Sequence, residues 1–136
     1  MAAKYSVAVR NAMGDALTAQ AAGSALLRVY DNTSSVPADC AAGNGTNVLL
    51  AELTCNATFA PAASAGVVTL NAITNDSSAN ASGTLSYWRL YKADGTTCVA
   101  QGSAGSTGQD INFGVTAFVA GATIAVSGLT ITIQGA

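Results

Sequence analysis

Leu27-Arg28-Val29-Tyr30 and Trp88-Arg89-Leu90-Tyr91 are two similar segments that decide the fold of this 136-residue chain. Each leads through turn-forming residues to a cysteine, Cys40 after the first and Cys98 after the second. Because side chains alternate between the two faces of a strand, each arginine shares a face with the tyrosine two positions later. We interpret the segments as two strands that present matched Arg-Tyr stripes on an exposed sheet face.

The three cysteines are an odd number without a Cys-x-x-Cys pair, which fits neither a disulfide framework nor a zinc site. If the two similar strands lie side by side, Cys40 and Cys98 come close at one edge, and Cys55 is left alone on another strand. The spacing leaves open whether Cys40 and Cys98 are bridged, since a cytosolic assembly favours free thiols.

Short β-branched and aromatic runs follow Gly23, separated by Gly, Ser, Asn, Asp and Thr, a pattern typical of an all-β sandwich or barrel. The last run alternates strictly, with Leu129, Ile131 and Ile133 expected inside and Thr130, Thr132 and Gln134 outside. Asp94-Gly95 predicts a hairpin turn. The expected strands, about eight and enough for two packed sheets, cover residues 25–31, 47–53, 66–73, 84–93, 98–102, 110–113, 122–127 and 129–134.

Residues 6–22 are the one convincing helix, with Ser6 as N-cap and Gly23 as the stop. Side chains recur every three to four residues at Val9, Met13, Leu17 and Gln20. Gly14 inside the helix costs up to about 1 kcal/mol relative to alanine, so we expect the helix to dock on the rest of the protein. The chain is expected to form a single domain, residues 1–136, with an arm and helix in 1–23 and a β-sandwich in 24–136.

The composition favours a protein that is covered by neighbours. Hydrophobic residues, many of them alanine, make up 50% of the chain and charged residues only 9%, against about 25% charged in typical domains. Five basic residues and a net charge of −2 give no stripe for phosphates, so nucleic acid is not an expected partner. No apolar run is long enough for a membrane helix, and Arg10 and Asn11 interrupt any secretion signal near the start.

No catalytic, cofactor-binding or metal-binding residue is assigned from the sequence. The chain lacks histidine, and with it the usual general base and the commonest transition-metal ligand. The carboxylates are scattered, mostly beside turn formers, and their spacing does not indicate a paired-carboxylate glycosidase. They are Asp15, Asp31, Asp39, Glu52, Asp76, Asp94 and Asp110.

Two further segments have a functional alternative to a structural role. Asn75-Asp76-Ser77 with Asn80 offers oxygen ligands for calcium, but the Asp-x-Asp-x-Asp-Gly order of a calcium loop is missing. Trp88 beside Tyr87 and Tyr91 offers a platform for a sugar or a base, but its position in the alternation favours the core. The remaining stretches are expected loops of a length suited to contacts, at residues 32–46, 56–65, 75–83 and 103–108.

Taken together, these motifs resemble a family of small proteins encoded among the head genes of tailed bacteriophages. The resemblance rests on Arg10-Asn11-Ala12-Met13, Leu27-Arg28-Val29-Tyr30, Asp76-Ser77-Ser78-Ala79-Asn80-Ala81 and the segment from Trp88-Arg89-Leu90-Tyr91 to Thr97-Cys98. Some members are head decoration, or cement, proteins: jelly-roll-like β-sandwiches that lie outside the major capsid lattice and clamp neighbouring capsomers.

The resemblance implies a mainly β, jelly-roll-like sandwich of about eight strands with an N-terminal helix. It also implies a non-enzymatic virion protein on the outer surface of the phage head, made in the bacterial cytoplasm and forming dimers or trimers. Its expected partner is the major capsid protein, which it stabilises by bridging subunits. The alternative is a virion-surface or tail module that binds a host glycan or another tail or collar protein, for which an exposed Trp88 would be the signal.

Overall fold

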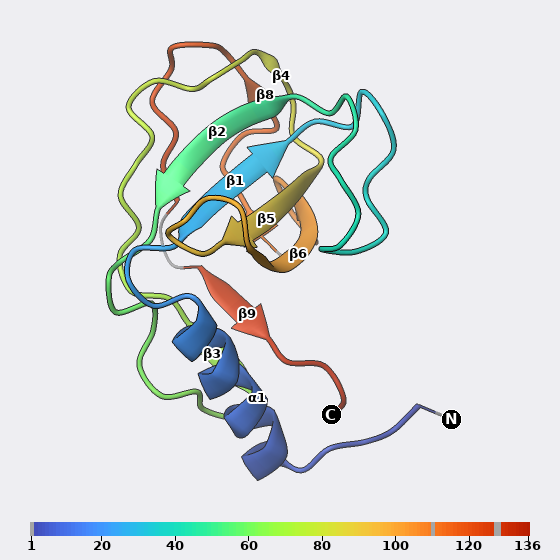
Figure 1. Ribbon diagram of the computed structural model, residues 1–136, viewed down its shortest axis with the longest axis vertical. Coiled ribbons are helices and arrows are strands. Elements are labelled where there is room, and N and C mark those ends of the chain that lie inside the picture. Colours follow the sequence, from blue (N-terminus) through green and yellow to red (C-terminus); the bar gives the residue numbers. More distant parts are fainter. Residues whose placement is uncertain (1, 110, 127–128) are drawn as a thin grey trace.

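The computed structural model describes residues 2–109, 111–126 and 129–136, which form one helix and nine strands. The elements are α1 (Val7–Gln20), β1 (Leu26–Tyr30), β2 (Leu49–Thr54), β3 (Val67–Thr69), β4 (Gly83–Thr84), β5 (Tyr87–Tyr91), β6 (Cys98–Gly105), β7 (Ile111–Asn112), β8 (Ala117–Phe118) and β9 (Thr130–Thr132). Five strands make a sheet in the order β2-β1-β5-β6-β7, and two ribbons pair β3 with β9 and β4 with β8. The chain is therefore mainly β with an N-terminal helix, as the sequence predicts. The sheet curls through the upper body, and α1 and the β3–β9 ribbon lie below it (Figure 1).

The two similar segments are the centre of the sheet. β1 and β5 are antiparallel neighbours, with Leu27 opposite Leu90 and Arg28 opposite Arg89. Directly opposed residues share a face, so the leucines fall on one side and the arginines on the other. The condition under which Cys40 and Cys98 come close is therefore met.

The apolar side of β1 and β5 faces the core. Trp88 is 3% exposed, and it belongs to the same buried cluster as Val68 of β3, Phe118 of β8 and Leu129. The core thus joins the sheet to both ribbons. Assigning Trp88 to the core is confirmed, and this tryptophan is not an exposed platform.

The helix begins where the sequence predicts. The Ser6 hydroxyl accepts a hydrogen bond from Val9 N at 3.3 Å, and the chain leaves the helix at Ala21, before Gly23 with its positive φ of 83°. Gly14 is the only buried residue of α1, and an added Cβ there would lie 2.8 Å from Val68 Cγ2. The docking expected of this helix is confirmed.

The docked side of α1 nevertheless differs from the three-to-four-residue recurrence in the sequence. Val9, Met13 and Gln20 are exposed, and Leu17 alone of that set turns inward. The helix approaches β3 through the missing side chain of Gly14, because only a glycine allows so close a contact with Val68. The larger side chains of Val9 and Met13 therefore remain exposed on the other side of the helix.

The last strand and the hairpin follow the sequence closely. Leu129 is buried, Ile131 and Ile133 are half-buried, and the residues between them are exposed. Gly95 has a φ of 71° and its N–H donates to Lys92 O at 2.9 Å, closing the turn between β5 and β6. The alternation and the turn are both confirmed.

Other strand boundaries are wrong. Residues 122–126 form no strand, and Ile124 makes only an isolated bridge with Asp76. The run expected over 84–93 divides into β4 and β5, β8 was not expected, and β6 extends through Gly105 into the expected loop 103–108. Part of the difference comes from short pairings that carry no periodic pattern, such as Ala104 with Ile111 in the parallel β6–β7 pair. Asp110 and Ser127, at the ends of two expected strands, lie outside the described residues.

The Arg-Tyr face of the sheet is buried, so its expected exposure is wrong. Tyr30, Arg89 and Tyr91 are each 3–6% exposed. The covering loop, residues 32–46, passes over this face and is joined to the start of β6 by a disulfide between Cys40 and Cys98. Cys55 is buried and unbridged.

Candidate functional site

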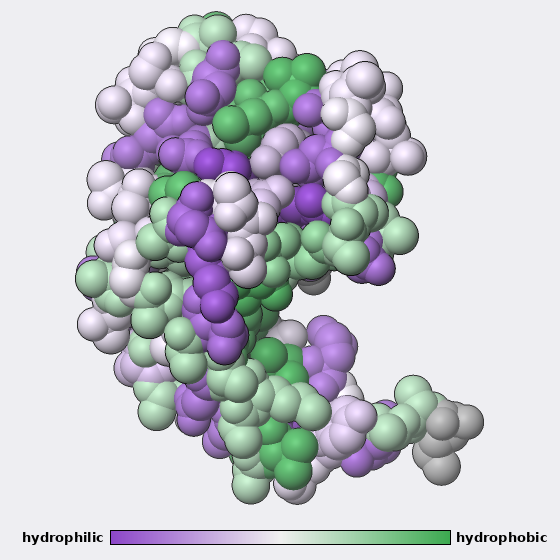
Figure 2. Space-filling view, viewed as in Figure 1, coloured by the Kyte–Doolittle hydropathy of each residue, from purple (hydrophilic) through white to green (hydrophobic). Residues whose placement is uncertain are grey.

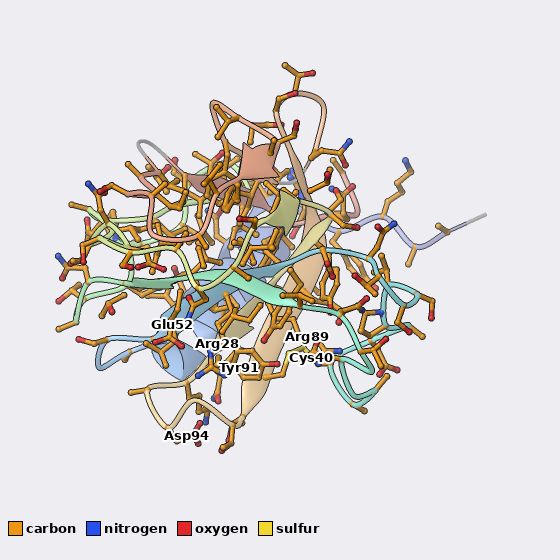
Figure 3. The ribbon with its side chains drawn as sticks, turned by 90° about the horizontal axis from the view of Figure 1, so that it is seen from above. Arg28, Cys40, Glu52, Arg89, Tyr91 and Asp94 are labelled. Carbon is orange, nitrogen blue, oxygen red and sulfur yellow. A yellow bond between two sulfur atoms is a disulfide. The ribbon has the colours of Figure 1, made fainter. Side chains whose placement is uncertain are left out.

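A polar row crosses four strands on the covered face of the sheet. Glu52 lies opposite Arg28, Arg28 opposite Arg89, and Arg89 opposite Gln101. Figure 3 shows Arg28 between Glu52 and Arg89, with Cys40 beyond Arg89. Two arginines directly opposite one another repel, so each needs its own partners.

Arg89 obtains its partners from the covering loop. Its NH2 group donates to Asp39 O at 2.7 Å and to Ala42 O at 2.6 Å, and its Nε donates to Gln101 Oε1 at 3.0 Å. Gln101 in turn donates from Nε2 to Pro37 O at 2.8 Å. A buried guanidinium that binds carbonyls through its planar fork fixes a loop in one position. This row therefore clamps the covering loop onto the sheet.

Arg28 is held by Glu52 and by the hairpin turn. Its Nε donates to Glu52 Oε2 at 2.6 Å, its NH1 group donates to Gly95 O at 2.9 Å, and its guanidinium carbon lies 4.9 Å from the centre of the Tyr91 ring. Burial acts to lower the pKa of Arg28, but the hydrogen bond and charge of Glu52 outweigh burial and raise it. Arg28 therefore stabilises the fold by joining β1 to β2 and to the hairpin turn.

Tyrosine hydroxyls and asparagine amides complete the clamp. The rings of Tyr30 and Tyr87 stack at 5.1 Å, and Asn47 Nδ2 donates to the Tyr87 hydroxyl at 3.1 Å. The Tyr91 hydroxyl accepts from Asn44 Nδ2 at 3.2 Å. Burial acts to raise the pKa of Tyr91, but the hydrogen bonds from Arg89 and Asn44 are stronger and lower it.

The N-terminal surface is apolar and exposed, in contrast to the polar row on the covered face. It consists of the exposed side chains of Tyr5, Val7, Val9 and Met13, which are 43%, 49%, 43% and 40% exposed. Figure 2 shows apolar residues gathered over the lower end of the molecule, where α1 lies.

The two charged side chains of α1 each have a hydrogen-bond partner in the segment before β3. Asp15 Oδ1 accepts from Ala63 N at 2.7 Å, and Arg10 NH1 donates to Ala65 O at 3.4 Å. Both charges of the helix therefore bond to the segment before β3, and the exposed face around Val9 and Met13 carries none. A charge-free apolar helix face of this kind suits a contact with another protein.

The β9 groove is a hollow of about 740 Å³ between the body and the β3–β9 ribbon, visible at the right of Figure 2. Residues 130–134 form one wall, and none of the described residues that line it carries a charge. The indole N–H of Trp88 is buried and has no hydrogen-bond partner among the described residues. The rest of the lining consists of Leu17, Ala100, Gln101, Gln109 and Asn112.

The segments weighed for chemistry are used by the fold. Asp76 accepts hydrogen bonds from Glu52 N at 2.9 Å and from Ser78 N at 3.0 Å, so its carboxylate joins a loop to β2. Asp94 accepts from Thr96 N and Thr97 N in the hairpin turn, and these bonds lower its pKa. Within residues 2–109, 111–126 and 129–136, no three His, Cys, Asp or Glu side chains converge on a point where a metal ion would fit. No helix in the same ranges is long and apolar enough to span a membrane.

For the part of the chain that the structure describes, the fold and these surfaces define a mainly β protein with an apolar N-terminal surface and a groove whose lining carries no charge. No protein-family model, curated protein or solved structure matches the chain. Sequence reasoning missed both features because each depends on long-range packing. The one available signal was Gly14, which marks the docked side of α1 and so places Val9 and Met13 outside.

Proposed function

We propose that this chain is a structural virion protein that decorates the outer surface of a phage head and stabilises the capsid by bridging major capsid protein subunits. The observation that carries the proposal is the distribution of charge. Arg28 and Arg89 bind the protein's own loops, whereas Val9 and Met13 face outward. A protein that remained a monomer in water would be more soluble with its charged side chains outside and its apolar side chains inside.

The resemblance to decoration proteins supplies the second support, and it includes the fold. We place the chain among divergent jelly-roll-like β-sandwiches, with the curled five-stranded sheet as one layer and the two ribbons as the other. The core that joins the sheet to both ribbons supports this assignment.

The mechanism is mechanical. Copies made in the bacterial cytoplasm attach to the assembled head through the N-terminal surface, and each contact is small. Repetition around the symmetry axes of a lattice turns weak contacts into strong cohesion. The proposed unit is a dimer or trimer, and neither nucleic acid nor a membrane is a proposed partner, since the arginines serve internal contacts.

The test is co-sedimentation of the purified protein with emptied phage heads, counting bound copies per capsid subunit. We expect saturation at a simple fixed ratio and heads that withstand higher temperature. The double variant Val9→Lys with Met13→Lys should bind at least tenfold more weakly, because it places two charges in the proposed contact.

Val115→Lys with Val119→Lys is the matched control. These valines are 56% and 62% exposed and lie outside the N-terminal surface, so this variant should bind like the parent protein. Equal loss in both variants would reject the N-terminal surface as the contact, and no binding of the parent chain to heads would reject decoration.

The alternative, a tail or surface module for a host glycan, has less support. Trp88 is 3% exposed, so the aromatic platform that a sugar requires is absent at this position. Attachment to purified tails but not to heads would nevertheless favour a tail or collar partner over the capsid.

A further inference from the structure

The strand β9 has one paired edge and one open edge. Ile133 N donates to Gly66 O at 2.8 Å, which fixes the phase of hydrogen bonding with β3. Hydrogen-bonded pairs alternate along an antiparallel ribbon, so the backbone N–H and C=O groups of Thr130 and Thr132 point away from β3. Among the described residues, none bonds to these four groups. Residues 130–134 line the β9 groove, so this open edge faces it.

An open strand edge beside a groove is a template for another strand. The facing wall carries Trp88, whose buried indole N–H has no acceptor among the described residues. An unpaired buried donor is destabilising, and a backbone carbonyl is the acceptor that an added strand would bring. The amides of Gln109 and Asn112 at the rim offer further uncharged hydrogen bonds. The groove thus fits an extended peptide with small, mostly uncharged side chains.

The N-terminal arm, residues 2–6, has small side chains at Ala2, Ala3 and Ser6 and larger ones at Lys4 and Tyr5. Its sequence is Ala-Ala-Lys-Tyr-Ser, it forms no helix or strand, and all five residues are exposed. The three arm residues before Tyr5 span about 10 Å when extended, at roughly 3.4 Å each, which equals the length of the three-residue strand β9. The arm therefore matches the groove edge in length.

The position of the arm favours exchange between copies. Tyr5 N donates to Gly135 O at 2.6 Å, and Lys4 Nζ donates to Ala136 O at 2.9 Å. The arm is thus held beside the residues that follow the groove wall, and from there it projects away from its own body (Figure 1). An arm that leaves one molecule at this point is placed to enter the groove of a neighbour.

We propose that the β9 groove binds the N-terminal arm of a second copy of this chain, which adds as a strand to the open edge of β9. The inference deepens the proposed function and rests on it for its biological setting, because arm exchange would link copies on a lattice. The contact itself is measured on the isolated protein, without heads.

The test is disulfide trapping between two chains that each carry one new cysteine. Ala3→Cys places a thiol on the arm, and Thr132→Cys places one on the open edge. Cys55 does not interfere, since it is 3% exposed and burial raises the pKa of its thiol to about 11. Mixed under mild oxidation, the two variants should form a mixed dimer at least tenfold faster than Ala3→Cys mixed with Val119→Cys, which measures random collision.

Two outcomes overturn the proposal. One is a mixed dimer no faster than the collision control. The other is rapid closure within single molecules of the double variant Ala3→Cys with Thr132→Cys in dilute solution, which would place the arm in its own groove.

A backbone variant tests the strand addition directly. Thr132→Pro removes one N–H from the open edge and leaves the bonds to β3 in place, whereas Thr132→Val keeps the N–H. Both variants also carry Gln134→Cys, which traps the arm of an Ala3→Cys partner. We expect the rate of this trapping to fall at least fivefold with Thr132→Pro and to be unchanged with Thr132→Val. Equal trapping in both would reject strand addition. Head binding of the same variants separates the two proposals. Arm exchange without head binding would reject only the decoration role. Head binding without arm exchange would reject only this inference.

Discussion

The covered face of the sheet and the exposed face of α1 treat charge in opposite ways. On the covered face, Arg28 and Arg89 lie under a loop and bind backbone carbonyls of the protein itself. On α1, Val9 and Met13 face solvent, and Arg10 and Asp15 bond to the segment before β3. The comparison teaches that Arg28 and Arg89 fix loops of the protein itself, whereas the exposed face of α1 around Val9 and Met13 is apolar and suited to a contact.

Removing the disulfide should weaken the covered face most. The double variant Cys40→Ser with Cys98→Ser opens a crosslink that spans 58 residues, and the chain-entropy model gives a loss of about 4 kcal/mol. Urea unfolding should show this loss, and a reductant should lower the parent protein to the same midpoint without changing the variant. A variant as stable as the parent would mean that the hydrogen bonds alone hold the loop.

Arg89→Ala should have the next largest effect. It removes three hydrogen bonds of a buried guanidinium and leaves Ala42 O without its donor, whereas Asp39 O keeps the bond from Ala42 N. We expect a loss of about 3 kcal/mol in the free energy of unfolding, measured by urea titration. Arg10→Ala is the control, because its one bond to Ala65 O is 3.4 Å long and exposed, and it should cost under about 0.5 kcal/mol. Equal losses of unfolding free energy in Arg89→Ala and Arg10→Ala would show that the buried arginine of the covered face stabilises the protein no more than the exposed arginine of α1.

Gly14→Ala tests how α1 docks. The new methyl group would lie 2.8 Å from Val68 Cγ2 and 2.9 Å from Ala63 Cβ. Overpacking costs about 1–3 kcal/mol, and the better helix propensity of alanine returns up to about 1 kcal/mol, so a net loss of about 1–2 kcal/mol is expected. Gln20→Ala, on the exposed side of the same helix, should change the thermal midpoint little. A stabilised Gly14→Ala would mean that the contact with β3 is loose.

The sequence predicts the local features of this fold. The Ser6 cap, the turn at Gly95, the alternation around Ile131 and the burial of Trp88 each depend on residues close in the chain, and each is confirmed. The similarity of the segments around Arg28 and Arg89 gives their pairing only as a condition, and the structure shows them as neighbours.

The covered face and the two exposed features could not be predicted in this way. The covering loop has no periodic pattern, and its position depends on carbonyls that bind Arg89 from about 50 residues away. β8 has two residues and one short partner, too few for a pattern to indicate a strand. The β9 groove exists because α1, β6 and β9 meet, and no single segment carries that information.

Asp94→Asn should have the smallest effect, and it sharpens the comparison by testing a charge on the surface. The carboxylate accepts from Thr96 N, Thr97 N and the Thr97 hydroxyl, which lowers its pKa below the unfolded value. Its stabilisation is therefore present above the unfolded pKa of about 3.9 and is lost as the pH falls toward the lowered folded pKa. The parent protein should be slightly more stable than the variant at pH 5–7, and the difference should shrink below about pH 4. Urea midpoints at pH 7, 5 and 3 measure this, and Thr97→Val should flatten the dependence because it removes one donor. A difference that stays constant down to pH 3 would show that the turn is held by its geometry and that the charge of Asp94 adds nothing.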